Sequence, residues 1–299
     1  MPDWATFAGF AGVVLVLLLL LAHASTSMVS GNPSTRDAGD RRSRRGHPYP
    51  GSVDPAVTER PDSTTVDADR TVDGGGSAVD AGPALSADAE VDRWTDRVHA
   101  TQPELSTVAL LGNVAFSQGT FGFLLLAGAW FTEIPAAAFG VSSATLSVAT
   151  LGAGAGLGLA LYAANEVAAT VGDRLGLGAD EGLREALAPS SAVGWAVLLL
   201  VVLPIIAGFE ELLFRGILVG VFAAGFGLSP WLLAALSSVA FALGHGAQGP
   251  AGVVVTGLLG FVLAVAFVLT GSLLVVVVAH YLVNALEFVV HEGLDVDWT

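Results

Sequence analysis

Apolar runs long enough to cross a bilayer constrain this chain more than any other feature. The first covers residues 5–22, and six more are expected at about 107–131, 144–171, 193–222, 230–245, 251–269 and 273–290. A helix needs roughly 20 apolar residues to cross about 30 Å of hydrocarbon. Because only helices and closed barrels satisfy their backbone groups inside a membrane, the sequence predicts an all-α, polytopic bundle of about seven transmembrane helices.

Composition agrees with a multi-pass protein of the cell membrane. Of the 299 residues, 53% are hydrophobic and only 13% are charged.

Two local features affect the expected geometry and packing of the helices. Pro204 lies inside the 193–222 run, where it either kinks the helix or splits it. Glycines at 152, 154, 156 and 158 alternate with small residues, a pattern that allows close helix packing.

The chain divides into three predicted parts. Residues 1–24 form a transmembrane anchor, residues 25–104 a disordered acidic linker, and residues 105–299 a membrane-embedded domain. The linker is rich in Pro, Gly, Ser, Thr and Asp, which bury too little apolar surface to order a chain. Five arginines between 36 and 45 place it in the cytoplasm by the positive-inside rule. A cleaved signal peptide is the alternative to the anchor, but no positive residue precedes the apolar run.

Charge and cysteine content exclude several classes of function. All 12 basic residues are arginine, and 27 acidic residues give a formal net charge of −15. This is a halophile-like composition, since like charges repel less in high salt. The negative excess argues against nucleic-acid binding. Without cysteine the chain has no disulfide, no thiolate metal site and no thiol nucleophile.

Charged side chains inside the apolar runs are the main indication of function. Between residues 193 and 290 only Glu210, Glu211, Arg215 and Glu287 carry a full formal charge. A charge near the bilayer centre costs about 2.5 kcal/mol or more, so a cluster there marks a functional site by default. The lipid bilayer is one expected partner of this chain, and a substrate reaching these charges within it is another.

The first polar segment places Glu211 and Arg215 four residues apart, on one face of a helix. The arginine can therefore neutralise Glu211. Glu210 is rotated by about 100° and its charge is less directly compensated, which suits a general base. A purely structural Glu–Arg pair explains this segment equally well.

Two further segments each place polar side chains one helical turn apart. Phe241 precedes His245 by four residues, and His280 precedes Asn284 by four. An imidazole with a carboxamide can stabilise an oxyanion or bind a metal ion. Taken singly, the His245 segment could equally be a helix-terminal histidine at the membrane interface, and an interfacial residue is the favoured reading of Glu287.

Together the three segments resemble the signature of the CPBP family, the CAAX proteases and bacteriocin-processing enzymes. The family pattern is Glu-Glu-x-x-x-Arg, then Phe-x-x-x-His, then His-x-x-x-Asn, each on its own transmembrane helix. Every position is present here, in order, over about a third of the chain. The matching residues are Glu210, Glu211, Arg215, Phe241, His245, His280 and Asn284.

The resemblance implies an intramembrane endopeptidase that cuts a membrane-anchored or hydrophobic peptide. Glu210 would activate a water molecule, His245 would assist it, and His280 and Asn284 would stabilise the oxyanion. Glu211, Arg215 and Phe241 would support the site. A divalent metal such as zinc is an open possibility, with Glu210, His245 and His280 as candidate ligands.

Two alternatives remain from the sequence. Buried Glu and His groups also serve transporters and proton relays, although no inverted repeat is visible here. A non-catalytic scaffold or immunity protein of the same fold would keep the same motifs. One geometric difficulty also remains, because a single crossing by 193–222 would put Glu210 and His245 at different depths.

Overall fold

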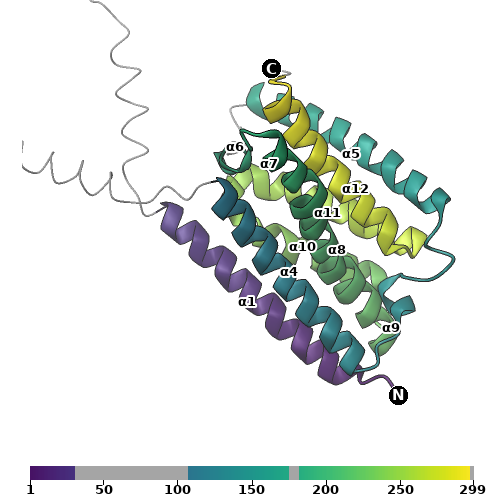
Figure 1. Cartoon of the computed structure of the whole chain (residues 1–299). Helices are drawn as coiled ribbons and strands as arrows, with labels where there is room; N and C mark the ends of the chain where they lie inside the picture. Colours follow the sequence, from purple (N-terminus) through teal and green to yellow (C-terminus); the bar gives the residue numbers. More distant parts are fainter. Residues whose placement is uncertain (31–106, 175–181, 297–299) are drawn as a thin grey trace, which may run out of the picture. The chain divides into compact units, whose positions relative to one another are not determined.

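The computed structural model describes residues 1–30, 107–174 and 182–296. These residues form helices and no strand, and they belong to one compact unit (Figure 1). The predicted all-α fold is confirmed. Most of the predicted linker, 25–104, lies outside the described residues, but residues 25–30 continue the first helix.

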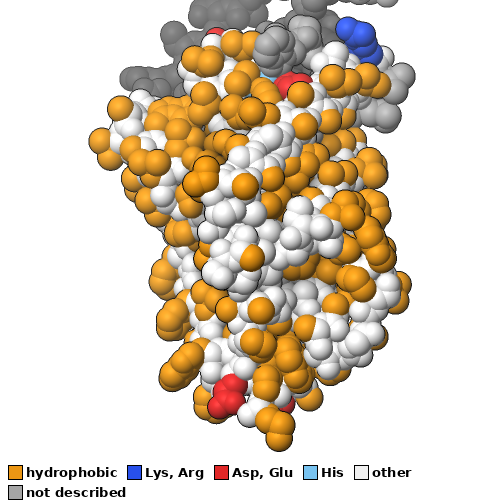
Figure 2. All heavy atoms as spheres, turned by 90° about the vertical axis from the view of Figure 1, so that its right-hand side faces the viewer, with side chains coloured by type: hydrophobic (Ala, Val, Ile, Leu, Met, Phe, Trp, Pro, Cys, Tyr) orange, Lys and Arg blue, Asp and Glu red, His pale blue; other side chains and the backbone are white. Residues whose placement is uncertain are grey.

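Six helices of the described chain are long and apolar enough to cross a membrane, and a seventh apolar helix is shorter. The shorter one, α10, has 15 residues. Figure 2 shows hydrophobic side chains over the middle of the visible face and acidic side chains near its two ends. The protein is therefore a multi-pass membrane protein. The long helices are α1 (Trp4–Ser30), α4 (Thr107–Phe131), α5 (Val148–Arg174), a continuous helix from Ala192 to Phe226, α11 (Gly249–Thr270), and α12 (Leu273–Glu287) with its π-helical continuation η5 (Phe288–Gly293); α10 covers Pro230–Gly244.

The helix from Ala192 to Phe226 is unbroken over 35 residues and is not split at Pro204. It alternates α-helical and π-helical stretches: α7 (Ala192–Val197), η2 (Leu198–Val202), α8 (Leu203–Glu211), η3 (Leu212–Val221) and α9 (Phe222–Phe226). Pro204 is the second residue of α8, separated from the end of η2 by Leu203 alone. A proline has no N–H to donate and crowds the preceding turn, and the wider π turn accommodates both effects.

Two tight turns return the chain into the bundle. Gly227 ends α9 with φ 64° and Gly271 ends α11 with φ 60°, backbone conformations that glycine adopts without a Cβ penalty. The Ser272 side chain then accepts the Val275 N–H and caps α12. These short connections make α9 and α10, and α11 and α12, neighbours in the chain and in space.

The first helix packs within the compact unit. Phe7 of α1 is fully buried, and its ring meets Phe139 edge-on with centroids 6.0 Å apart. Phe139 belongs to the short 3₁₀ helix η1 (Ala136–Phe139). At the start of α1 the Asp3 N–H donates to the Thr132 carbonyl at 2.9 Å, and hydrogen bonds from Thr6 lower the pKa of the Asp3 carboxyl. α1 also contacts α4, α10 and the 3₁₀ helix η4 (Gly246–Gln248), and α5 packs along α12 (Figure 1).

Candidate active site

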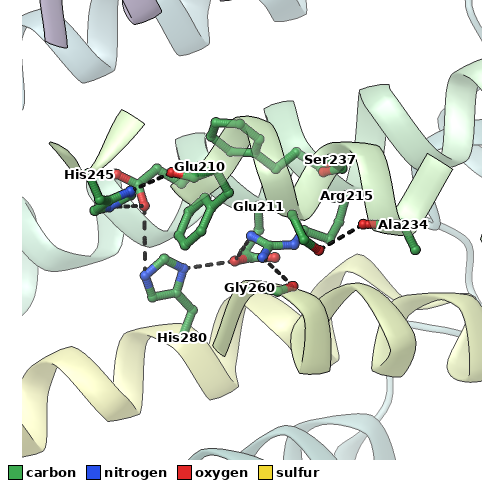
Figure 3. A network of polar contacts seen from close by, with 11 residues as sticks. Glu210, Glu211, Arg215, Ala234, Ser237, His245, Gly260 and His280 are labelled. Carbon is green, nitrogen blue, oxygen red and sulfur yellow. Dashed lines mark hydrogen bonds and ion pairs between the residues drawn. The ribbon is translucent and has the colours of Figure 1, made fainter. Parts of the chain in front are cut away.

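The two adjacent glutamates lie near the middle of the 35-residue helix, at the junction of α8 and η3. Glu211 and Arg215 are both 0% exposed, and Glu210 is 8% exposed. Arg215 Nη1 donates to Glu211 Oε1 at 2.6 Å, and Arg215 Nη2 donates to the Gly260 carbonyl of α11 at 2.7 Å (Figure 3). The predicted Glu211–Arg215 pair thus forms in the interior, and α11 completes it.

Phe241 of α10 covers the buried guanidinium. The centre of the guanidinium lies 4.6 Å from the ring centroid, a favourable cation–π distance. The ring also meets Phe214 edge-on, at 5.0 Å between centroids. Gly260 lets α11 approach, because a Cβ at this position would lie 2.8 Å from the Phe241 ring and 3.2 Å from Arg215. Phe241 is therefore a packing residue of the site.

His280 of α12 is oriented by the same ion pair. Its Nδ1 lies 2.8 Å from Glu211 Oε1, the oxygen that also accepts from Arg215. A carboxylate paired with arginine can only accept, so Nδ1 carries the proton and donates. The other ring nitrogen, Nε2, lies 3.7 Å from Glu210 Oε2. Glu211 thus fixes the ring so that Nε2 is turned toward Glu210.

His245 is oriented in the same way by a backbone group. It caps the end of α10, and its Nδ1 donates to the Phe241 carbonyl at 2.8 Å. Its Nε2 lies 4.0 Å from Glu210 Oε2. Two imidazoles from different helices therefore turn Nε2 toward one carboxylate oxygen, with Nδ1 of each ring held by an acceptor (Figure 3).

Glu210 and His245 lie close together because two helical legs have nearly equal length. The chain runs from Glu210 to the end of α9 at Phe226, turns at Gly227, and returns along the 15 residues of α10 to His245. Each leg is roughly 23 Å at 1.5 Å per residue. The difference in depth expected from the sequence is therefore absent, since α10 ends at the level of Glu210.

Asn284 and Glu287 lie further along α12 than His280. Asn284 is half-buried one turn beyond His280, and its side chain makes no hydrogen bond to the described residues of the cluster. Glu287 joins a different group: it accepts from Asn165 of α5 and forms an ion pair with Arg184 at 3.2 Å. Arg184 belongs to the short helix α6 (Gly182–Leu187).

The three candidate metal ligands face one another at separations slightly wider than those between ligands of one zinc ion. Nε2 of His245 and of His280 lie 4.0 and 3.7 Å from Glu210 Oε2. Two ligand atoms of one tetrahedral zinc lie about 3.3–3.6 Å apart, given zinc–ligand distances of roughly 2.0–2.2 Å. In the described part of the chain, three ligand atoms within 4.8 Å of one another come from Glu166, Glu287 and His291 instead.

Sequence reasoning missed two partners of the cluster. The Gly260 carbonyl accepts from Arg215, and Ser237 of α10 donates to the Phe214 carbonyl of η3 at 2.6 Å. A backbone acceptor on another helix leaves no trace in a side-chain motif. Ser237 had a signal, since a hydroxyl in an otherwise apolar helix needs an acceptor. It ties α10 to the helix that carries both glutamates.

The fold and the site define a class: an all-α, multi-pass membrane protein with a buried Glu–Arg–His cluster near the middle of its longest helix. A family model described as "Type II CAAX prenyl endopeptidase Rce1-like" matches residues 192–286. All residues of the cluster fall within that range, so the resemblance to the CPBP family is confirmed over this segment. The match supports a function of the same kind as that of CAAX-type intramembrane proteases. No curated protein and no solved structure matches the chain.

Proposed function

We propose that the protein is an intramembrane endopeptidase in which Glu210 activates a water molecule to hydrolyse a peptide bond of a membrane-associated protein or peptide. One observation carries the proposal: the Nε2 atoms of His245 and His280 both face the same oxygen of Glu210. Separations of 4.0 and 3.7 Å are too long for direct hydrogen bonds but suit a water molecule that bonds both groups.

The base would be the glutamate that Arg215 does not neutralise directly. Glu211 is committed to Arg215 and His280, whereas Glu210 accepts no hydrogen bond from the described residues. Its side chain is 11% exposed and that of His245 is 23% exposed, so the cluster opens on the side of these two residues. Water and a peptide would reach the cluster there.

Proton transfer follows from the orientation of the rings. Glu210 takes a proton from the water, whose oxygen attacks the peptide carbonyl carbon and forms a tetrahedral oxyanion. His245, with Nδ1–H held by the Phe241 carbonyl, keeps Nε2 free to accept this proton from Glu210 and to pass it to the leaving amine, which restores the Glu210 carboxylate. The peptide C–N bond then breaks.

Side chains of α12 would stabilise the oxyanion. His280, when Nε2 also carries a proton, would donate to the oxyanion while Glu211 holds Nδ1–H. Asn284, one turn along the helix, would provide a second donor through its amide. Glu211 and Arg215 act as positioning residues, because they contact the reacting groups only through His280.

The test compares wild type with Glu210→Gln on membrane-anchored reporter peptides in liposomes at high salt. The panel includes prenylated peptides, since the matching family is named for CAAX prenyl endopeptidases. Loss of the base should slow cleavage about 10²- to 10⁴-fold, measured by mass spectrometry. Glu185→Gln, the same change at an exposed glutamate of α6, should cleave at the wild-type rate.

Two outcomes contradict the proposal. Wild-type cleavage by a folded Glu210→Gln protein removes the role of this residue. If both proteins unfold cooperatively and neither cleaves any peptide, a transporter or a non-catalytic scaffold becomes the better interpretation. Measurement of proton flux in the same liposomes distinguishes these two. Repeating the assay with a chelator decides whether a metal ion is needed.

A further inference from the structure

A second polar cluster lies at the far end of the last membrane span. It brings together Glu166 from the last turns of α5 with Glu287 and His291 from α12 and η5. Their side chains are only 13–17% exposed. Glu287 and His291 are four residues apart, on one face of the helix, and Glu166 faces them from the neighbouring helix. None of the three belongs to the proposed catalytic machinery.

The three side chains converge more closely than the histidines around Glu210. His291 Nε2 lies 2.9 Å from Glu166 Oε1 and 3.8 Å from Glu287 Oε2, and one ligand atom from each residue lies within 4.8 Å of the others. The spacing of about 3.3–3.6 Å expected around a tetrahedral zinc ion falls between these two distances. One imidazole and two carboxylates are ligands that zinc accepts.

The position of His291 Nε2 requires either a proton on that nitrogen or a metal ion beside it. A neutral imidazole nitrogen without a proton would point its lone pair at two carboxylates, so either a proton or a metal ion must lie there. Among the described residues of this cluster, three carboxylates carry a negative charge and Arg184 carries the one full positive charge. The carboxylates belong to Glu166, Glu287 and Glu292. With a neutral imidazole the cluster carries −2. The neutral tautomer with its proton on Nε2 leaves this charge unchanged, whereas a divalent ion brings the summed charge of these described residues to zero, which a partly buried site favours.

The surrounding residues already orient the carboxylates as outer-shell groups do. Asn165 donates to Glu287 Oε1 and leaves Oε2 turned toward His291. Arg184 Nη1 contacts that Oε2 at 3.2 Å, while its Nε holds Glu292 at 2.9 Å. A metal ion on Oε2 would displace only the longer of these two contacts. Hydrogen bonds of this kind fix the geometry of metal ligands.

We propose that Glu166, Glu287 and His291 bind one divalent cation of the zinc type, with water as a further ligand. The ion joins α5 to the final span, the same pair of helices that pack along each other. Because α12 also carries His280 and Asn284, the ion stabilises the position of the helix that supplies the proposed oxyanion donors. The site is distinct from the Glu210 cluster and does not depend on the proposed protease activity.

The test is zinc binding by the full chain in detergent, with Zn²⁺ alone as the probe. Wild type should bind zinc, as measured by equilibrium dialysis and elemental analysis. The bound ion should raise the midpoint of thermal unfolding. His291→Gln and Glu166→Gln should each weaken this binding about 100-fold or more and abolish the shift. His245→Gln, the same change in the Glu210 cluster, should keep both.

Two outcomes overturn the proposal. If His291→Gln binds zinc as tightly as wild type, or if wild type binds none, the contact between His291 and Glu166 is a hydrogen bond within a polar cluster and not part of a metal site. X-ray absorption at the zinc edge of wild type decides the matter even if the variants fail to fold. One imidazole per ion supports this site, and two imidazoles per ion place the metal between His245 and His280 instead.

Discussion

Glu211 and Arg215 carry opposite full charges into a fully buried site. The bond of 2.6 Å and the Gly260 carbonyl give two of the three guanidinium nitrogens an acceptor, but Glu211 Oε2 and Arg215 Nε have no hydrogen-bond partner among the described residues. A buried pair of this kind contributes little net stability, because desolvation offsets the attraction. Its clearest contribution is geometric, since Glu211 orients His280.

Removal of one partner should therefore be more harmful than removal of both. Arg215→Met leaves Glu211 as an uncompensated buried charge and should lower the free energy of unfolding by about 3–5 kcal/mol. The double variant Glu211→Gln with Arg215→Met should lose distinctly less. Reversible unfolding in mixed micelles measures both, with Arg174→Met, at an exposed arginine, as the control.

Cleavage provides a second readout of this pair. The double variant keeps the fold but no longer fixes Nδ1 of His280 through a carboxylate, so its turnover should fall although its stability recovers. Equal losses of stability in the single and double variants would contradict the pairing. Wild-type turnover in the double variant would contradict the positioning role.

Between helices, the α5–α12 contact depends on two glycines one turn apart. A Cβ on Gly154 would lie 2.8 Å from the Val275 carbonyl, and one on Gly158 would lie 2.9 Å from the Ala279 carbonyl. Gly152 and Gly156 have nothing within 4 Å. The predicted packing role thus applies to alternate members of the glycine run, because residues two apart point to different sides of a helix.

Gly158→Ala should therefore destabilise the protein, whereas Gly156→Ala should not. The extra methyl at Gly158 presses against backbone that cannot move aside, at a cost of about 1–3 kcal/mol. At Gly156 alanine should leave stability unchanged or raise it by up to about 1 kcal/mol through helix propensity. Thermal unfolding of the two variants in one detergent makes the comparison, and equal melting temperatures would show that the helices do not pack this closely.

For the whole molecule, the charge balance sets the response to salt. The formal net charge is −15, with arginine as the sole basic residue. Raising KCl from about 0.1 M to about 1 M shortens the Debye length from roughly 10 Å to 3 Å and screens repulsion among the acidic groups. The melting temperature, measured by circular dichroism, should rise by several degrees over this range of KCl concentration.

A sucrose titration is the control for this prediction. Sucrose stabilises folded proteins by exclusion from their surface and does not screen charge. A rise with KCl well beyond that with sucrose supports screening. A melting temperature that falls or stays constant with KCl would contradict a halophile-like role for the acidic excess.

The sequence by itself determined the class of the fold and predicted the candidate residues of the site. Apolar length and the cost of membrane charges singled out the helices and the residues Glu210, Glu211 and Arg215, because both effects act on each residue wherever the chain folds. The i,i+4 spacing also predicted the Glu211–Arg215 bond, since that distance is fixed within one helix.

Only the tertiary structure decided which groups meet across helices. His280 bonds Glu211 rather than Asn284, α11 supplies the Gly260 carbonyl, and Glu287 joins Glu166 and not Glu210. These contacts depend on helix lengths, turns and rotations, which small differences in packing set and a motif does not record. The length of α10 is a further example. The apolar run in the sequence gives the length of this helix only roughly, whereas the structure ends it at His245 and so brings that ring to the level of Glu210.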